Sequence, residues 1–396
     1  MAATRTMATI WHKACSAHGI LTLSSHFVQL AILMMLLLGM TKADCECGYA
    51  SPVSRENGDV LFTDLLETDF AHLTHLADNT DWLGQTWNKS SESARGQFGE
   101  VFSKDNIVPN PARSSRVIRV DTGVNGQPAG LDLIVRSKLV DDMVPSAELD
   151  SARSDILWGS FRAGLKLTGD PGTCAAFFWY YNDTQEIDME FLSQEFDASK
   201  NIFPINLVLQ SRAALEAGYN AQATGNFKKI NLPFDPTRGF HEYRMDFLPR
   251  RVIFYVDGQA LAEMTGDAVP DHPGHLILQH WSNGNALWSG GPPPRDAVLT
   301  VAYVRAYFNS SNEARKQDWE KRCHDAAAPG AVCQIPERVS VANPSLFSTA
   351  ANMTNNQTVS TGGLEASKSL AAGANAVSWL FVAAALLFTG FCSELW

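Results

Sequence analysis

The sequence predicts an all-β fold, an antiparallel β-sandwich, from three observations. Short runs that alternate apolar and polar residues recur from Ser115 to Ser310, with turn residues between them. A period of two at this spacing is typical of antiparallel sheets that pack face to face. No sustained helical periodicity occurs before Asn312–Arg322, which we expect to form a short helix carrying Cys323. The chain has 396 residues and is 45% hydrophobic, which suffices for one large core.

The N-terminal segment has the pattern of a secretory signal. Residues 28–40, VQLAILMMLLLGM, are apolar, follow a weakly basic start and are short for a membrane span. We therefore expect a signal peptide over residues 1–43 with cleavage after Ala43, and a signal anchor is the alternative. Residues 44–114 are irregular in pattern and are interpreted as the N-terminal part of the same module as the strand-rich region that follows, with one strand candidate at Val60–Leu65.

Two tryptophans of this N-terminal part, Trp82 and Trp87, stand among Asn, Ser and Gly, so we expect them in loops. Farther along, the strand-like runs are VIRV, LDLIV, FRAGLKL, AAFFWYY, EIDMEF, INLVL, HEYRMDF, RVIFYV, HLILQHW and VLTVAYVRAYF. Val256-Asp257-Gly258 has the composition of a hairpin turn that follows a strand.

The C-terminal end predicts attachment to a membrane by a lipid. Residues 311–338 are expected to hold a short helix and a disulfide loop, and residues 339–375 a stalk rich in Ser, Thr and Asn. Residues 376–396 begin with a short apolar tail after small residues, which is the pattern of a glycosylphosphatidylinositol-anchor signal. A single transmembrane helix is the alternative. The expected location is the outer face of the plasma membrane or the cell wall.

Cysteines and glycosylation sequons agree with secretion. Without the two ends five cysteines remain, and most should pair in an oxidising compartment. Cys323 and Cys333 enclose a short loop and are the first expected bridge, and either Cys45 or Cys47 could reach Cys174, leaving one odd thiol. Candidate glycosylation sites are Asn88, Asn182, Asn309, Asn352 and Asn356.

Charge and composition exclude several classes of partner. The net charge of -11 disfavours nucleic acid and anionic membrane surfaces, and it suits a neutral polymer. No His, Asp or Glu cluster has metal-ligand spacing, so we expect no metal and no cofactor, and His241 and His280 are interpreted as structural. The loop Gly290–Pro294 is not a phosphate cradle, because no strand-to-helix switch follows it. We expect a monomer.

The central stretch of the chain is Glu186-Ile187-Asp188-Met189-Glu190. On a β-strand its three carboxylates project from one face and its two apolar residues from the other. Glycoside hydrolysis needs two carboxyl groups beside a glycosidic bond, one protonated and one ionised. The outer pair lies about 13 Å apart along the backbone, and side chains that lean together come near the roughly 5–5.5 Å of a retaining enzyme. The alternative is a solvated acidic face on an edge strand.

The stretch resembles the active-site strand of the family-16 glycoside hydrolases, which share a concanavalin-like jelly roll. The resemblance covers residues 115–310 and extends to further motifs in the same order as in bacterial lichenases. These motifs are Trp158–Ala163 with Lys166, Phe177–Tyr180, Leu232–Asp235, Gly239–Tyr243 and Phe254–Gly258. It implies that Glu186 is the nucleophile, Asp188 its assisting acid and Glu190 the general acid/base. It also implies substrate contacts at Phe178, Tyr180, Asn206, Gln279, Trp281 and Trp288, although each aromatic residue could instead be core.

The chain also departs from the family pattern. Thr184 stands where lichenases often have an aromatic residue, and Asp150 stands where an Arg usually lies near a substrate-binding Glu, here matched by Glu148. Ala302 replaces an Asp that helps to bind calcium in many members, so no calcium is predicted. The strand lacks the extra residue that some members insert between the Asp and the second Glu. In this respect it resembles lichenases, xyloglucan-type enzymes and fungal wall transglycosylases more than laminarinases.

These observations predict a retaining endo-glycosidase acting on β-glucan with β-1,3 or mixed β-1,3/1,4 linkages, in cell-wall carbohydrate metabolism. A wall transglycosylase would use the same carboxylates. A lectin-like binding protein without turnover is the rival from another class, and a purely structural wall protein is a further one.

Overall fold

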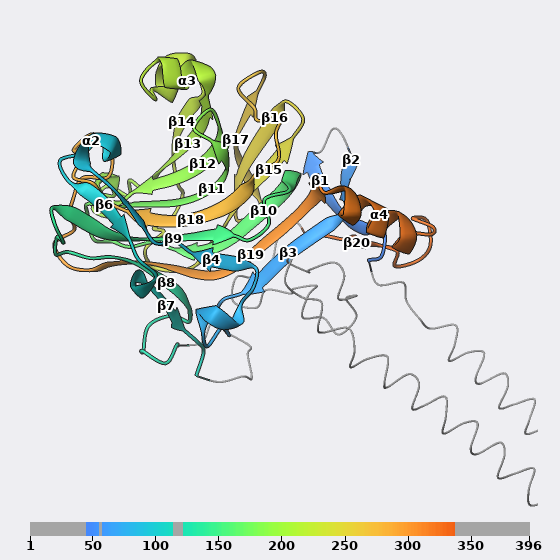
Figure 1. The fold of residues 1–396 in the computed structure, drawn as a ribbon, viewed down its shortest axis with the longest axis horizontal. Helices are drawn as coiled ribbons and strands as arrows, with labels where there is room; N and C mark the ends of the chain where they lie inside the picture. The colour runs from blue at the N-terminus through green and yellow to red at the C-terminus, as the bar shows by residue number, and fades with distance from the viewer. Residues whose placement is uncertain (1–44, 55–57, 114–121, 337–396) are drawn as a thin grey trace, which may run out of the picture.

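The computed structural model describes residues 45–54, 58–113 and 122–336, which form a two-layered β-sandwich with a smaller sheet at one side (Figure 1). The predicted all-β sandwich is therefore confirmed. The expected signal peptide, the strand-like run VIRV, the stalk, the anchor tail, Asn352 and Asn356 lie outside the described residues.

One layer of the sandwich is an eight-stranded sheet, in which all pairs are antiparallel. Its strands, in spatial order, are β17 (Gln259–Thr265), β16 (Arg251–Val256), β15 (His241–Leu248), β10 (Ile156–Lys166), β19 (Ala297–Ser310), β8 (Gly130–Val135) and β7 (Ile107–Asn110), and β3 (Asp64–Asp69) also pairs with β19.

The other layer is a nine-stranded sheet, antiparallel except where β6 meets β9. Its strands, in spatial order, are β14 (Phe227–Asn231), β13 (Pro204–Ser211), β12 (Gln185–Leu192), β11 (Cys174–Asn182), β18 (His275–Trp281), β9 (Met143–Ser151), β6 (Gly99–Phe102) and β5 (Trp87–Lys89), and β4 (Trp82–Gly84) also pairs with β9.

A small sheet lies against the outside of the eight-stranded layer. It consists of β2 (Gly58–Phe62), β1 (Gly48–Ser54) and β20 (Val332–Gln334), and β1 and β20 run parallel. The α-helices of the described residues are α2 (Ser91–Ala94), α3 (Arg212–Glu216) and α4 (Glu313–Arg322), and their 3-10 turns are η1 (Leu76–Asp78), η2 (Lys104–Asn106), η3 (Ser193–Glu195) and η4 (Ala221–Thr224). The expected helix at Asn312–Arg322 is confirmed, with Asn312 as its N-cap and Cys323 as its C-cap.

The main core lies between the two large sheets, because each strand turns its alternate apolar side chains inward. Ile187 and Met189 of β12 are fully buried there. Aromatic contacts join the layers, with ring centres 4.7 Å apart for Phe191 and Tyr243. This burial fixes which face of β12 points away from the core.

The expected hairpin turn after β16 is confirmed. Asp257 and Gly258 both have positive φ, 47° and 75°, and they connect β16 to β17 with two residues. Paired positive φ values belong to the tight turns whose twist matches a hairpin, and Gly adopts them without strain.

The N-terminal part is more regular than its sequence pattern indicates. Trp82 and Trp87, expected in loops, lie in β4 and β5, and Trp82 is buried with its Nε1 donating to Thr68 Oγ1 at 2.8 Å. The strand candidate Val60–Leu65 is divided between β2 and β3. These strands are short and gain their stability from pairing with distant strands, which a local pattern does not reveal.

The expected bridge between Cys323 and Cys333 is wrong. The structure pairs Cys45 with Cys333 and Cys47 with Cys323, and it leaves Cys174 buried and free. The physical reason is the parallel pairing of β1 with β20, which sets Tyr49 opposite Cys333, while α4 ends beside the start of β1. The N-terminal cysteines therefore do not reach Cys174, which lies in the central sheet.

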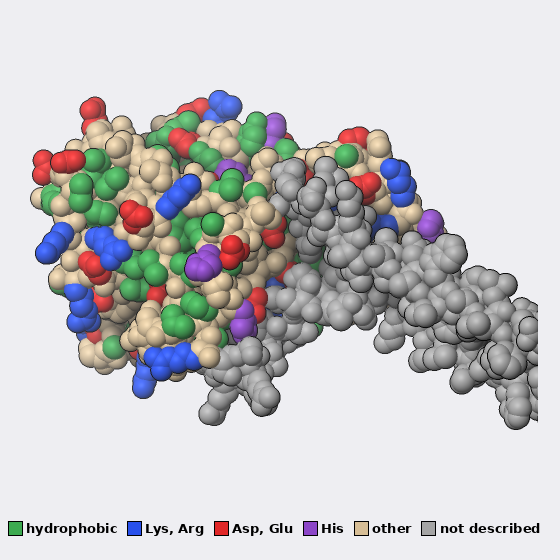
Figure 2. All heavy atoms as spheres, turned by 60° about the horizontal axis from the view of Figure 1, so that its bottom comes forward, with side chains coloured by type: hydrophobic (Ala, Val, Ile, Leu, Met, Phe, Trp, Pro, Cys, Tyr) green, Lys and Arg blue, Asp and Glu red, His purple; other side chains and the backbone are tan. Residues whose placement is uncertain are grey.

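Basic and acidic side chains are interspersed with hydrophobic ones on the face that Figure 2 presents. Within the described ranges no helix is long and apolar enough to cross a membrane. The same residues include no group of three or more His, Cys, Asp and Glu side chains that could hold a metal ion.

Candidate active site

Three carboxyl groups lie on one face of β12, as the sequence predicts. Glu186, Asp188 and Glu190 alternate with Ile187 and Met189, which are buried in the core. The pairing of β12 with both neighbouring strands runs without a register shift from residue 186 to residue 190, so no inserted residue interrupts the alternation. We call this outer face of the nine-stranded sheet the carboxyl face.

Burial raises the pKa of all three carboxyl groups. Asp188 is only 3% exposed, and its pKa lies well above the usual range because burial and then the neighbouring charge of Glu186 disfavour its ionised form. Burial raises the pKa of Glu186 to about 7, although the hydrogen bond with Asp188 opposes the rise. Three such groups cannot all ionise together. The arrangement therefore holds protonated and ionised carboxyls side by side, with Asp188 donating its proton to Glu186.

Glu190 has two hydrogen-bond donors on one oxygen. Its Oε1 accepts from Trp288 Nε1 at 3.3 Å and from the buried thiol of Cys174 at 3.4 Å. Burial raises the pKa of Glu190, and these two hydrogen bonds and the charge of Arg95 counteract that rise. With Oε1 occupied, Oε2 is the oxygen left to carry and transfer a proton.

Strand pairing brings three of the expected substrate contacts beside the carboxyls. Phe178 lies opposite Asp188, Tyr180 opposite Glu186, and Asn206 opposite Glu190. Cross-strand neighbours of this kind point to the same face of a sheet. Their exposure differs, because Asn206 is 1% exposed and Phe178 8%, whereas Tyr180 is half-buried.

Asn206 has a protein partner as well. Its Nδ2 donates to Glu195 Oε2 at 3.3 Å, and Glu195 also pairs with Lys229 at 2.5 Å. The amide of Asn206 is thus held in one orientation beside Glu190.

The remaining expected contacts extend the carboxyl face across β18 and into the loop after it. Gln279 lies opposite Ala176 and donates to Glu148, and Trp281 lies opposite Cys174 and is partly exposed. Trp288 follows in the loop and reaches Glu190 as described above. Their roles as substrate contacts remain predictions.

Asp150, which stands where the family pattern usually has an Arg, is a partly buried carboxyl group. Asp150 lies opposite Ile277, next to Glu148 along β9, and no donor in the described part of the chain bonds its buried Oδ1. Burial raises the pKa of Asp150 to about 8, and the charge of Glu148 adds to the rise. Trp87 Nε1 donates to Glu148 Oε1 at 2.8 Å, so a residue expected in a loop lies beside the site.

Sequence reasoning missed several residues of the site. The sequence pattern predicts only a disulfide for Cys174, and it predicts no role for Arg95, Tyr219 or Asp183. No local pattern distinguishes the last three, since they lie in loops that meet only in the folded chain. Cys174 could have been found, because it alternates with Ala176 and Phe178 on β11 and therefore shares their face.

The two histidines interpreted as structural have protein partners. His280 is fully buried, with Nδ1 2.8 Å from the carbonyl of Leu133 and Nε2 2.9 Å from Thr173 Oγ1, and burial lowers its pKa to about 4. His241 Nδ1 lies 2.7 Å from Asp257 Oδ2 in the turn after β16.

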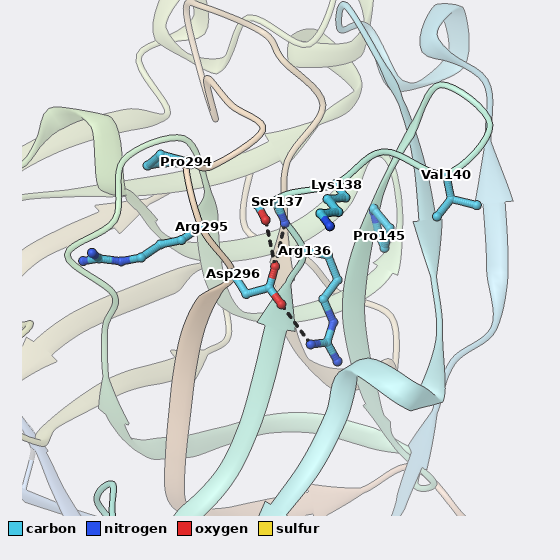
Figure 3. A pocket seen from close by; sticks show the side chains of 8 residues that line it. All are labelled: Arg136, Ser137, Lys138, Val140, Pro145, Pro294, Arg295 and Asp296. Atoms are coloured by element: carbon cyan, nitrogen blue, oxygen red, sulfur yellow. Dashed lines mark hydrogen bonds and ion pairs between the residues drawn. The ribbon is translucent and has the colours of Figure 1, made fainter.

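A separate hollow lies at the end of β8 (Figure 3). Two of its charged groups are paired with each other: Arg136 reaches Asp296 at 3.0 Å, and the backbone N–H of Ser137 donates to the same carboxylate at 2.9 Å. The hollow contains none of the carboxyls of β12, so we do not place chemistry there.

Three of the expected glycosylation sites are described. Asn88 and Asn182 are exposed, and Asn182 Oδ1 accepts from the backbone and the hydroxyl of Thr184 at 2.9 Å. Asn309 is half-buried and accepts from the backbone N–H of Thr63 at 3.2 Å. Modification at any of them remains a prediction.

Several known proteins are similar to this chain in sequence. The family model described as "Glycosyl hydrolases family 16" matches residues 119–305. The chain is 29% identical over 140 residues to the beta-glucanase of Bacillus licheniformis, which covers 34% of this chain and 51% of that protein. It is 28% identical over 151 residues to the "Probable xyloglucan endotransglucosylase/hydrolase protein 27" of Arabidopsis thaliana, covering 34% of this chain and 41% of that protein.

The chain thus spans about half the length of the Bacillus relative. Among solved structures, it is similar to the endo-beta-1,3-glucanase of Pyrococcus furiosus with a TM-score of 0.47 and 20% identity, over 63% of this chain and 96% of that one.

Proposed function

We propose that this chain, a family-16 glycoside hydrolase by its residues 119–305, is a retaining endo-β-glucanase that cleaves β-1,3 or mixed β-1,3/1,4 linkages. The observation that carries the proposal is the set of three carboxyls on the outer face of β12, of which Asp188 bonds Glu186 while Glu190 is bonded by Trp288 and Cys174. Such a set provides an ionised nucleophile and a protonated acid on one strand.

The mechanism follows from these positions. Glu190 protonates the leaving glycosidic oxygen while Glu186 attacks the anomeric carbon, which forms a covalent glycosyl-enzyme. The hydrogen bond from Asp188 stabilises the ionised form of Glu186 before the attack. Glu190, now ionised, removes a proton from the incoming water, whose oxygen bonds to the anomeric carbon as the ester to Glu186 breaks.

Aromatic and amide side chains beside the carboxyls suit a neutral sugar polymer. Phe178 and Tyr180 offer faces and edges to pyranose rings, and Asn206 and Gln279 offer amides to hydroxyl groups. We also propose that the protein is secreted as a monomer and is held at the cell surface by a lipid anchor, on the sequence patterns at its two ends.

Transglycosylation is the second candidate function. It needs the same carboxyls and differs only in the acceptor, a sugar hydroxyl instead of water. The similarity to a plant protein named as an endotransglucosylase/hydrolase favours considering it. A lectin-like protein without turnover is less favoured, because none of the three acids is lost.

Product analysis on a panel of β-glucans, with and without an oligosaccharide acceptor, tests the proposal. We expect shorter products from the wild type, no products from Glu186→Gln, and unchanged products from Glu216→Gln, the same change at an exposed glutamate of α3. Longer chains that form only with acceptor would favour the transglycosylase. Binding of a glucan without any change in its length would contradict the catalytic assignment.

A further inference from the structure

Arg95 and Tyr219 meet although they come from distant parts of the nine-stranded sheet. Arg95 is the C-cap of α2 and precedes β6, whereas Tyr219 follows α3, beyond the end of β13. The guanidinium carbon of Arg95 lies 4.1 Å from the centre of the Tyr219 ring. A planar guanidinium at this distance from an aromatic ring is a favourable cation–π contact.

A chain of contacts continues from Tyr219 to the catalytic strand. The Tyr219 hydroxyl donates to Asp183 Oδ2 at 3.0 Å, and the Tyr180 hydroxyl donates to Asp183 Oδ1 at 2.8 Å. Asp183 lies in the turn between β11 and β12, and Tyr180 is the neighbour of Glu186 across the two strands. We call Arg95, Tyr219 and Asp183 the bridge.

The bridge passes over the carboxyl face. In the sheet, β6 and β13 are separated by β9, β18, β11 and β12, so their backbones lie about 24 Å apart along a flat sheet at roughly 4.8 Å per strand. Contact between Arg95 and Tyr219 therefore requires both segments to reach over the strands between them. In Figure 1 the two short helices that precede these residues, α2 and α3, lie on the side of the molecule away from α4.

The opposite end of the bridge is also fixed. Asn283 Nδ2 donates to the carbonyl of Ala94 at 2.7 Å and Asn285 Nδ2 to the carbonyl of Arg95 at 3.2 Å. Both asparagines lie in the loop that carries Trp288, the hydrogen-bond partner of Glu190. The bridge thus runs from the loop at the Glu190 end of β12 to the turn at its Glu186 end.

Electrostatics agrees with this position. The charge of Arg95 lowers the pKa of both Glu186 and Glu190, counteracting the rise that burial causes. The interaction between exposed charges is largely screened beyond a Debye length of roughly 8–10 Å, so this effect agrees with a guanidinium that lies near both carboxyls.

We propose that the bridge selects against branched glucan: an unbranched chain lies between the bridge and β12, whereas a branch beside the scissile bond collides with Arg95 and Tyr219. This inference rests on the proposed function and names the substrate class within it. A single cation–π contact made by an exposed cation is weak. The bridge therefore opens readily enough to admit a polymer from the side, and it is not a permanent tunnel.

The test compares linear β-1,3-glucan with β-1,3-glucan that carries single β-1,6-linked glucose branches. The variants are Tyr219→Ala, which removes the bridge, Arg95→Lys, which keeps the charge without the planar stack, and Tyr219→Phe, which keeps the stack without the hydroxyl. The matched control is Tyr181→Ala, an exposed tyrosine outside the bridge, whose ring stacks on His272 instead. Thermal melting checks that each variant is folded.

We expect the ratio of kcat/KM on branched glucan to kcat/KM on linear glucan to rise at least fivefold in Tyr219→Ala and Arg95→Lys. Tyr219→Phe should give a smaller rise, and Tyr181→Ala none. An unchanged ratio in folded Tyr219→Ala and Arg95→Lys would overturn the proposal.

A second ratio, of the binding affinity for branched glucan to that for linear glucan, is measured in variants that also carry Glu186→Gln, in which no turnover is expected. A wild type that binds glucan but does not cleave it refutes the proposed function, while the bridge is still judged by the binding ratio. No preference for linear glucan in that background, or no glucan binding at all, overturns the bridge as a selector.

Discussion

At the scale of single residues, Asp188 links the chemistry of the site to the stability of the fold. Its carboxyl is nearly inaccessible to water and bonds Glu186, so the folded chain favours its protonated form. An amide of the same shape can donate to Glu186 as well, but it cannot exchange a proton. Comparing the two side chains separates hydrogen bonding from proton exchange.

We predict that Asp188→Asn retains about tenfold more activity than Asp188→Ala, because one hydrogen bond to a charged group contributes about 1.5 kcal/mol. Initial rates on β-glucan measure this difference. Equal rates in the two variants would show that the hydrogen bond to Glu186 has no catalytic effect.

The same substitution predicts a pH dependence of stability. The pKa of Asp188 in the folded state lies above its unfolded value, so the stability linked to this group is complete below about pH 4 and is lost as pH rises through the folded pKa. Asn does not titrate. The Tm of Asp188→Asn relative to wild type should therefore rise with pH, and a difference that is constant from pH 4 to pH 9 would contradict the pKa direction.

Cys174 offers a second test at the residue scale. Its thiol donates to Glu190 Oε1 and lowers the pKa of that carboxyl against the effect of burial. The proposed mechanism needs Glu190 protonated, so we expect Cys174→Ala to move the alkaline limb of the pH–rate profile to higher pH. Cys174→Ser keeps a donor and is the control. A limb that moves equally in both variants would exclude the hydrogen bond as the cause.

At the scale of elements, β12 packs one face into the core and presents its three carboxyl groups on the other. The sequence predicts this division because three acids alternate with two apolar residues, and the structure has that alternation without a bulge. The spacing between acids is thereby coupled to core packing, since a shift of one residue would bury all three carboxyls.

We predict that Met189→Ala lowers the free energy of unfolding by about 2–5 kcal/mol, because Met189 is fully buried between the sheets. The control is Leu287→Ala, whose side chain is 89% exposed and whose removal should cost less than about 0.5 kcal/mol. Denaturant unfolding measures both. Similar losses in the two variants would contradict the assigned core face.

At the scale of the whole molecule, the two disulfides connect the first described residues to the last. Cys45–Cys333 and Cys47–Cys323 have sequence separations of 288 and 276, and they join the small sheet and α4 into one unit. Once one disulfide has formed, the other closes a ring of only about a dozen residues. The first disulfide removed therefore costs less stability than the second.

Chain-entropy arithmetic predicts that Cys47→Ser with Cys323→Ser lowers the free energy of unfolding by about 3 kcal/mol, while replacement of all four cysteines lowers it by about 9 kcal/mol. Denaturant unfolding of the secreted protein checks this ratio. A loss of stability that only doubles between the two-cysteine and the four-cysteine variant would show that the two disulfides act independently.

The sequence was informative where local pattern decides the structure. Alternation identified strands such as β8, β10, β11 and β12, and the acids of β12 identified the carboxyl face. It failed where distant segments meet. The pairing of β1 with β20 determines the disulfides, the meeting of Arg95 with Tyr219 requires both loops in place, and Trp82 became core only through pairing of β4 with β9.

The anomeric form of the first product shows whether the reaction passes through a covalent intermediate on Glu186, as we propose. Proton NMR of the earliest reducing ends released from a linear β-glucan distinguishes the two forms before mutarotation mixes them. Double displacement predicts the β-anomer first, with the signal absent in Glu186→Gln. The α-anomer as first product, or the β-anomer formed equally well by Glu186→Gln, would contradict double displacement through Glu186.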